Sequence, residues 1–233
     1  MSQWIQDFID RFYLDFIKDD RWHYITRGLE TTIKITVMAV LLGIGIGFVV
    51  AIIRSTHDKT GKLKLPNLIC RIYLTVIRGT PVVVQLLIIY FVVFASVDVE
   101  KLFVAVIAFG INSGAYVAEI VRGGIMSIDK GQMEAGRSLG FNYTQTMLYI
   151  ICPQAFKNVL PALGNELIVL LKETSVSGYI AMEDLTKGGD IIRSQTYDAM
   201  MTLLAVAAIY LVIVMFFEFL VGKLERRLRN SDH

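Results

Sequence analysis

Cysteine and histidine are scarce in this sequence. It holds two cysteines, Cys70 and Cys152, and three scattered histidines among 233 residues. Two cysteines make one pair at most, and both fall within or beside apolar stretches, which favours packed thiols over a disulfide. Isolated histidines do not provide the ligand spacing of a metal site. We therefore expect no metal site and no disulfide framework.

Motifs for enzyme chemistry are also missing. The sequence has no G-x-x-x-x-G-K-[ST] loop to cradle phosphates, no H-E-x-x-H helix and no G-x-S-x-G turn. We expect the chain not to be an enzyme and to bind no cofactor of its own. Its net charge is only +2, without a long basic patch, so nucleic acid is not an expected partner.

Long apolar runs dominate what is present. Hydrophobic residues make up 55% of the chain, and the mean hydropathy is +0.56. Uncharged runs such as 102–118 and 199–217 are long enough to cross a bilayer. The sequence predicts an all-α integral membrane protein with five core transmembrane helices, of which the second is one long span kinked near Pro81. The predicted spans are 31–53, 66–96, 101–121, 158–182 and 199–221.

Two glycines in the first span, Gly43 and Gly47, lie one helical turn apart. Their G-x-G-x-G context superficially suggests a nucleotide-binding loop. Apolar residues flank it on both sides, however, and no strand-to-helix pattern surrounds it. We predict that this small face packs closely against another helix.

The first 20 residues are acidic and lack the basic region and apolar core of a secretory signal. Their apolar residues recur at helical spacing, with most charges on the other side. Segment 1–28 is predicted to be an interfacial amphipathic helix, and its acidity disfavours the cytoplasmic leaflet. The apolar residues are Trp4, Ile5, Phe8, Ile9, Phe12, Tyr13, Phe16 and Ile17.

Charges in the connecting segments predict the orientation in the membrane. Lys and Arg exceed Asp and Glu in three connecting segments, which are predicted to be cytoplasmic. Acids exceed bases in three others, which are predicted to lie outside. The N-terminus is therefore predicted outside and the C-terminus in the cytoplasm. The cytoplasmic segments are 54–64, 122–157 and 222–233, and the outside segments are 1–21, 97–101 and 182–197.

The longest polar interruption runs from Ile120 to Pro153 and predicts two helices that meet at a sharp corner. Gly140 stands where a helix end favours a left-handed residue. Asn142 offers an N-cap oxygen to the helix that follows. A rigid polar element held at a membrane is suited to docking another protein, although an ordinary cytoplasmic loop has the same general pattern.

Several positions in this loop resemble the EAA loop of the membrane subunits of bacterial ABC importers. The pattern is E-A-A-x3-G-x9-I-x-L-P, and its spacing holds throughout. Gly136 replaces the third small residue and Cys152 replaces the leucine. Segments 78–85 and 122–132 resemble the polar amino acid branch of the same family, and the resemblance covers about residues 29–226. The matching positions are Glu134, Ala135, Gly136, Gly140, Ile150 and Pro153.

The resemblance implies a permease subunit of an ATP-driven importer that moves a polar amino acid across the bacterial cytoplasmic (inner) membrane. The implied partners are an ABC ATPase dimer that binds ATP and Mg²⁺, a second permease subunit, identical or paralogous, an extracytoplasmic substrate-binding protein, and membrane lipid. Segment 29–226 is expected to be the transmembrane domain, with the EAA loop at about 122–153, and 227–233 a cytoplasmic tail. The residues implied to dock the ATPase are Glu134, Ala135, Gly136, Arg137 and Gly140.

Polar residues within the apolar spans are candidates for a substrate site. Arg78 is predicted to bind an amino acid carboxylate, because a guanidinium can bind two oxygens and keeps its charge. Glu119 is a candidate for a cationic side chain. Alternatively, Arg78 and an acidic residue pair only to hold two helices together, and Asn112 and Ser113 are expected to hydrogen-bond between helices. The stretch predicted to receive the ammonium or a polar side chain is Lys172, Glu173, Thr174 and Ser175, which resembles the K-[DE]-[ST]-S stretch of the polar amino acid importers.

Two other function classes fit parts of the sequence. A secondary transporter or channel could use the intramembrane charges of Arg78, Lys172 and Glu173, but no internal inverted repeat is visible. An intramembrane enzyme would need catalytic residues that the sequence lacks. Co-purification with an ATPase would separate the importer from a secondary transporter.

Overall fold

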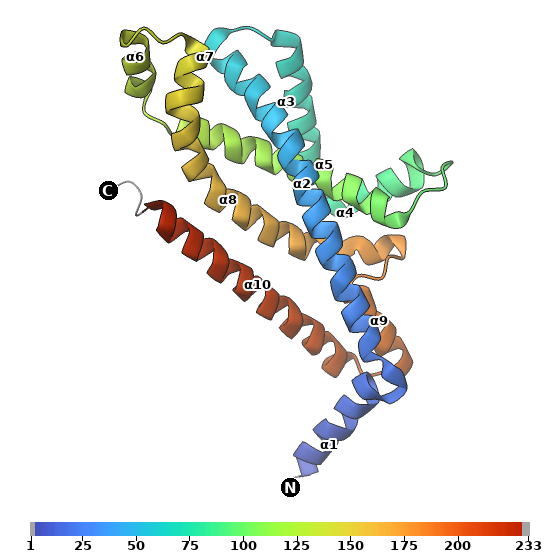
Figure 1. Cartoon of the computed structure of the whole chain (residues 1–233). Coiled ribbons are helices and arrows are strands. Elements are labelled where there is room, and N and C mark those ends of the chain that lie inside the picture. Colours follow the sequence, from blue (N-terminus) through green and yellow to red (C-terminus); the bar gives the residue numbers. More distant parts are fainter. Residues whose placement is uncertain (1–2, 230–233) are drawn as a thin grey trace.

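The computed structural model describes residues 3–229, which form helices and contain no β-strand (Figure 1). The prediction of an all-α protein is confirmed for this range. The long and short α-helices are α1 Gln3–Phe12, α2 Trp22–Thr60, α3 Lys64–Arg78, α4 Val82–Ile88, α5 Lys101–Met126, α6 Lys130–Ser138, α7 Tyr143–Thr146, α8 Cys152–Glu173, α9 Leu185–Thr196 and α10 Ala199–Arg229. Shorter π- and 3₁₀-helical segments are η1 Tyr13–Ile17, η2 Lys18–Asp20, η3 Ile89–Val93, η4 Met147–Ile151 and η5 Thr174–Ile180.

Three helices of the described chain, α2, α5 and α10, are long and apolar enough to cross a membrane. Helix α3 and the segment 82–93 pass the same test together, but the chain bends by 108° at the break between them. The predicted bend near Pro81 is present as a sharp break between two helices, and one span over 66–96 stays a prediction. Pro81 stands at the break with an extended ψ of 137° and no N–H to donate, so α3 cannot continue through it.

Helix α2 is longer than the predicted span 31–53, and it packs along α5. Gly43 and Gly47 lie in that contact. A Cβ atom at Gly43 would lie 2.9 Å from the Cβ of Ser113, and one at Gly47 would collide with the side chain of Val117. The prediction that these glycines serve close helix packing is confirmed.

The main apolar core lies where α2, α4, α5 and α8 meet, and η5 closes it. Its largest side chains are Ile35, Leu86, Phe109, Leu170 and Ile180, each 2% exposed or less. Helix α10 contributes little to this core, since only 6% of its most apolar window is buried. Its exposed apolar surface fits contact with lipid or with another membrane subunit.

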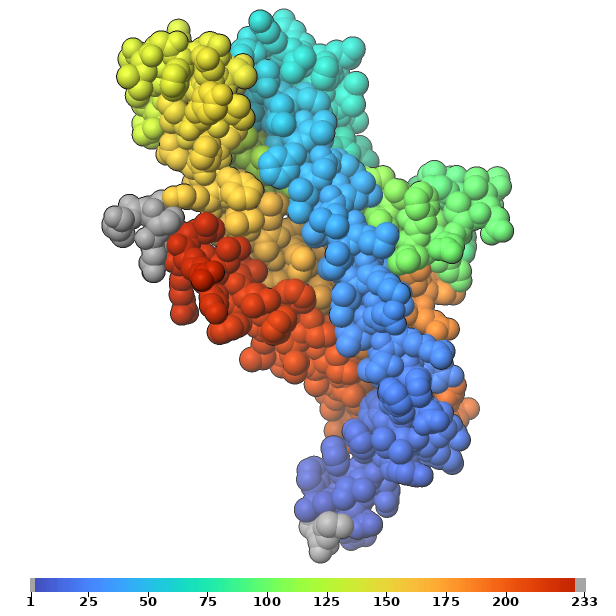
Figure 2. All heavy atoms as spheres, viewed as in Figure 1, coloured from blue at the N-terminus to red at the C-terminus, as the bar shows by residue number. Residues whose placement is uncertain are grey.

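Most connecting segments lie at two ends of the molecule, and the turn before α5 projects to one side (Figure 1). Helix α6 and the α2–α3 connection lie at one end, and the last turns of α10 lie on the same side. Helices α1 and α9 lie at the opposite end, where α1 projects from the body as a separate lobe (Figure 2). This grouping agrees with the charge pattern, while the orientation in the membrane stays a prediction.

The N-terminal segment forms an exposed amphipathic helix over residues 3–12. None of its side chains is buried, and Trp4 is 75% exposed. The predicted boundary at residue 28 falls inside α2, where Gly28 touches the backbone of Asp184 at the start of α9. The division into 1–28, 29–226 and 227–233 stays a prediction, and residues 230–233 of the predicted tail lie outside the described range.

Candidate functional site

The polar loop after α5 forms the predicted pair of helices with a corner between them. Asp129 caps α6 by accepting a 2.7 Å hydrogen bond from the N–H of Gly131. Gly140 has a φ of +85°, the left-handed conformation expected from its place after the helix. Asn142 then caps α7 through a reciprocal capping box with Gln145, in which both hydrogen bonds are 2.9 Å.

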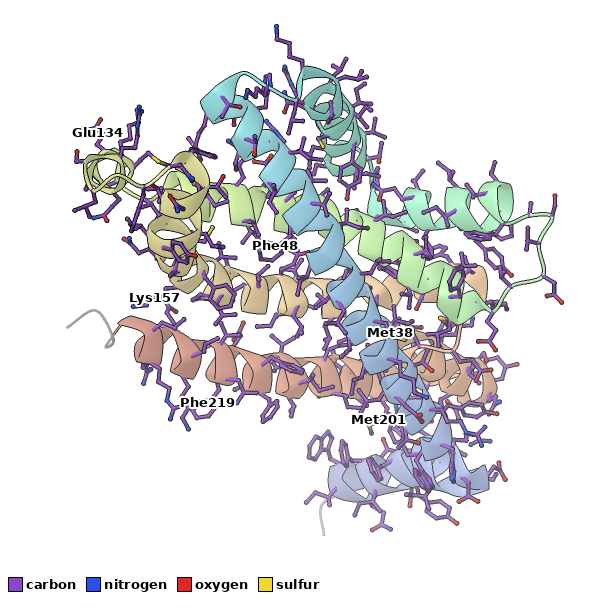
Figure 3. The ribbon with its side chains drawn as sticks, turned by 45° about the horizontal axis from the view of Figure 1, so that its top comes forward. Met38, Phe48, Glu134, Lys157, Met201 and Phe219 are labelled. Carbon is purple, nitrogen blue, oxygen red and sulfur yellow. The ribbon has the colours of Figure 1, made fainter. Side chains whose placement is uncertain are left out.

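Close packing fixes α6 against α7. Gly136 is the buried residue of α6, and a Cβ there would lie 2.5 Å from Cγ2 and 2.8 Å from Oγ1 of Thr146. Glu134, Ala135 and Arg137 are exposed on the same helix. Figure 3 shows Glu134 at the outer edge of the molecule, far from Met201 near α1. The loop therefore presents charged side chains on a rigid, projecting helix.

A groove of about 830 Å³ runs beside α6. It extends from the loop to Lys59, near the end of α2. The charge pattern predicts that this end of α2 lies in the cytoplasm. Met133, Phe141 and Tyr143 supply apolar surface, and Arg137 supplies charge. A groove with mixed apolar and charged walls suits a protein partner.

Predicted substrate residues Arg78 and Glu119 meet in a second cavity, of about 560 Å³, between α2, α3 and α5. Arg78 also lies over the ring of Tyr116, 5.7 Å from its centroid. Two further arginines that the sequence did not single out, Arg54 and Arg71, line the same cavity.

Glu119 lies among three guanidinium groups from three places in the chain. Its carboxylate oxygens are 2.9 Å from Arg54, 3.2 Å from Arg122 and 4.0 Å from Arg78. Arg71 adds a further positive charge without an ion-pair partner among the residues described. The cavity therefore carries excess positive charge and favours an anionic group such as a carboxylate. Because Glu119 is already neutralised, it offers little charge to a cationic ligand.

The stretch 172–175 lies elsewhere, at the end of α8 and the start of η5, and η5 packs against α4. Lys172 is exposed. Thr174 is fully buried, and its hydroxyl donates a 2.8 Å hydrogen bond to the carbonyl of Leu171. None of the four residues lines the arginine cavity. The structure thus brings together Arg78 and Glu119 but not Lys172, Glu173, Thr174 and Ser175.

Side chains inside the helix bundle form two buried polar pairs. Asn112 donates a 2.9 Å hydrogen bond to Oε1 of Gln85, and Ser113 donates a 2.8 Å bond to Glu166. The prediction that Asn112 and Ser113 join helices is confirmed. Gln85 was not identified from the sequence as a hydrogen-bonding residue, because a lone glutamine in an apolar run belongs to no periodic pattern. Its place four residues after Pro81 is the one signal that could have marked it as a partner for backbone groups freed by the proline.

Comparison with known proteins decides the family. A family profile described as the inner membrane component of binding-protein-dependent transport systems matches residues 43–230. The chain belongs to this family. It is therefore an inner membrane permease subunit of an ABC transporter, and the resemblance based on the EAA loop is confirmed.

Individual relatives cover most of the chain. An arginine transport system permease protein of Bacillus subtilis (strain 168) is 36% identical over 212 residues, covering 90% of this chain and 94% of that protein. A glutamine transport system permease protein of Escherichia coli (strain K12) is 37% identical over 199 residues, covering 84% and 90%. These matches support the importer and give no support to a secondary transporter or channel.

Solved structures agree with this assignment. An amino acid ABC transporter crystallised with histidines has a TM-score of 0.81 and 43% identity, covering 88% of this chain and 94% of that one. An inward-facing methionine ABC transporter has a TM-score of 0.78 at 18% identity, covering 91% and 99%, and shows the fold alone. Both matches extend over nearly the whole helical bundle.

Proposed function

We propose that this chain moves a polar amino acid through the inner membrane as one of two permease subunits, powered by a separate ATPase dimer. The observation that carries the proposal is the rigid, exposed α6–α7 loop at the EAA positions of a family member. An extracytoplasmic binding protein delivers the substrate, and the ATPase supplies ATP and Mg²⁺ binding. The permease chain hydrolyses nothing itself.

The proposed arrangement has five core spans. They are α2, the broken pair α3 and α4 with η3, α5, α8 with η5, and α10. The charge pattern orients α6 toward the cytoplasm and α1 toward the outside. This orientation brings the docking loop to the side where ATP is available.

The ATPase docks on the exposed face of α6, through Glu134, Ala135 and Arg137, while Gly136 and Gly140 fix the shape of the loop. The test is co-purification of the partner ATPase with the permease. Reversing the charge at Glu134 or Arg137 should weaken retention of the ATPase and lower transport-linked ATP hydrolysis. Reversal at Asp98, an exposed acid in the turn before α5, is the matched control and should retain the ATPase. Equal retention in all three variants would contradict the docking role.

The substrate carboxylate binds at Arg78 in the arginine cavity, with Glu119 holding the guanidinium groups in place. Glu173, Thr174 and Ser175, with Lys172, form a second polar region further along the path, suited to the ammonium or the side chain. Arg78→Lys keeps the charge but loses the planar fork. We expect its KM for uptake to rise about tenfold, corresponding to ~1.4 kcal/mol.

The control for this test is Arg71→Lys, since Arg71 lines the same cavity without an ion pair to Glu119. Both variants must retain the ATPase before uptake is compared. A wild-type KM in Arg78→Lys would show that Arg78 serves only as an ion-pair partner of Glu119.

A further inference from the structure

The break between α3 and α4 leaves backbone carbonyls without partners from their own helix. Helix α3 ends at Arg78, α4 begins at Val82, and the chain bends by 108° between them. The last turn of any helix leaves carbonyl groups without intrahelical partners. Side chains can take the place of those partners where bulk water does not reach the carbonyls.

The side chain of Gln85 binds two of the carbonyls at the break. The Nε2 amide of Gln85 donates to the carbonyls of Ile77 at 2.7 Å and Thr80 at 3.0 Å, and it lies 2.8 Å from the Thr80 hydroxyl. The Thr80 hydroxyl itself donates to the carbonyl of Val76 at 2.8 Å. A primary amide has two N–H groups, so all of its donor capacity is used at the break.

The other end of the same amide ties the break to α5. Oε1 of Gln85 accepts a 2.9 Å hydrogen bond from Asn112, and the two side chains are 7% and 2% exposed. Asn112 shares one face of α5 with Tyr116 and Glu119, at spacings of four and seven residues. These last two residues meet the guanidinium of Arg78, which is the final residue of α3.

We infer that Gln85 is a positioning residue: its side chain holds the α3–α4 break against α5 and thereby directs Arg78 to Tyr116 and Glu119. Gln85 itself does not line the arginine cavity. Any role of Arg78 in uptake rests on the proposed function, whereas the position of the break does not. Two measurements therefore separate the claims.

The first measurement reports the break directly. Spin labels at Ile69 and Val92, which are 60% and 70% exposed on either side of it, are placed in a chain whose native cysteines are replaced. The labelled permease is reconstituted with its ATPase in lipid, with one labelled copy per transporter. Gln85→Leu should shift or broaden the distance distribution. The matched control is Gln154→Leu, because the Gln154 amide lies far from the break in sequence and donates hydrogen bonds to the Ile150 carbonyl, four residues earlier, at 2.8 Å and to Gln132 at 3.4 Å.

A distribution for Gln85→Leu that matches the control would overturn the inference. Asn112→Ala provides a second variant if Gln85→Leu does not assemble, because it removes only the tether to α5. It should broaden the distribution less than Gln85→Leu, and an unchanged distribution would show that the tether does not hold the break.

The second measurement tests whether Gln85 acts through Arg78. Uptake of radiolabelled glutamine and of arginine is measured in wild-type and Arg78→Lys backgrounds. Gln85→Leu should raise KM about tenfold in the wild-type background and by less than twofold in Arg78→Lys. Equal increases in both backgrounds would overturn the positioning role, since a general structural defect acts independently of Arg78. If Arg78→Lys alone leaves KM unchanged, the carboxylate role in the proposed function fails, and the label distances still decide what holds the break.

Discussion

Replacing Gly136 with alanine would restore the usual EAA pattern at the α6–α7 contact, and it is expected to impair this protein. Alanine favours a helix over glycine by about 1 kcal/mol, so local propensity alone predicts stabilisation. The packing predicts the opposite. A new Cβ would lie 2.5 Å from Cγ2 and 2.8 Å from Oγ1 of Thr146, about 1 Å closer than ordinary contact.

Thr146 has little freedom to give way. Its side chain is fully buried, and its hydroxyl donates a 3.0 Å hydrogen bond to the carbonyl of Asn142, the N-cap of α7. Overpacking of this kind costs about 1 to 3 kcal/mol. After subtraction of the helix propensity gain, we expect Gly136→Ala to lower stability by about 1 kcal/mol and to displace α6 from α7. For a chain of this size, the melting temperature should fall by about 2 to 4 °C.

Thermal unfolding in detergent and ATPase co-purification measure the two consequences. Gly123→Ala is the matched control, because a Cβ at that helical glycine meets nothing within 4 Å and adds only propensity. The double variant Gly136→Ala with Thr146→Ala removes the collision and should recover part of the loss. A stability of Gly136→Ala equal to or above that of wild type would refute the packing argument.

Three further predictions concern the corner, the pH dependence and the topology. A Cβ at Gly140 meets nothing within 4 Å, but the residue has a φ of +85°. Gly140→Val should therefore lower stability by about 1 to 2 kcal/mol and reduce coupled ATP hydrolysis, whereas Gly140→Asn should lower stability less. Equal activity of the two variants would argue against a conformational requirement. Burial raises the pKa of Asp184, the buried N-cap of α9, from 3.8 to about 6, so its ionisation opposes folding and stability falls as pH rises through that interval. Asp184→Asn keeps the cap oxygen and should be more stable than wild type above about pH 6, by up to about 3 kcal/mol. Thermal unfolding scans should show this advantage disappear near pH 4. A stability difference that does not change with pH would contradict the raised pKa of Asp184. In whole cells of a chain freed of native cysteines, an impermeant thiol reagent should label a cysteine at Lys187 and spare one at Lys62, and the reverse result would invert the topology.

The sequence alone determined the features that depend on neighbouring residues. A glycine after a polar helix and an asparagine before the next one predict a corner, and Gly140 and Asn142 adopt the expected geometry. Apolar run length predicts membrane helices because the bilayer thickness sets their minimum length. Small residues one turn apart predict close packing, as Gly43 shows against α5.

Only the tertiary structure decided which distant residues meet. Pro81 predicts a bend, but only the structure shows its size of 108° and the hydrogen bonds of Gln85 and Asn112 that link the break to α5. Arg54 and Glu119 lie 65 residues apart in sequence and 2.9 Å apart in space. The stretch 172–175 carries equally polar residues, yet α8 ends away from the arginine cavity. Local signals fix backbone conformation, whereas the composition of a cavity depends on how helices from separate parts of the chain pack together.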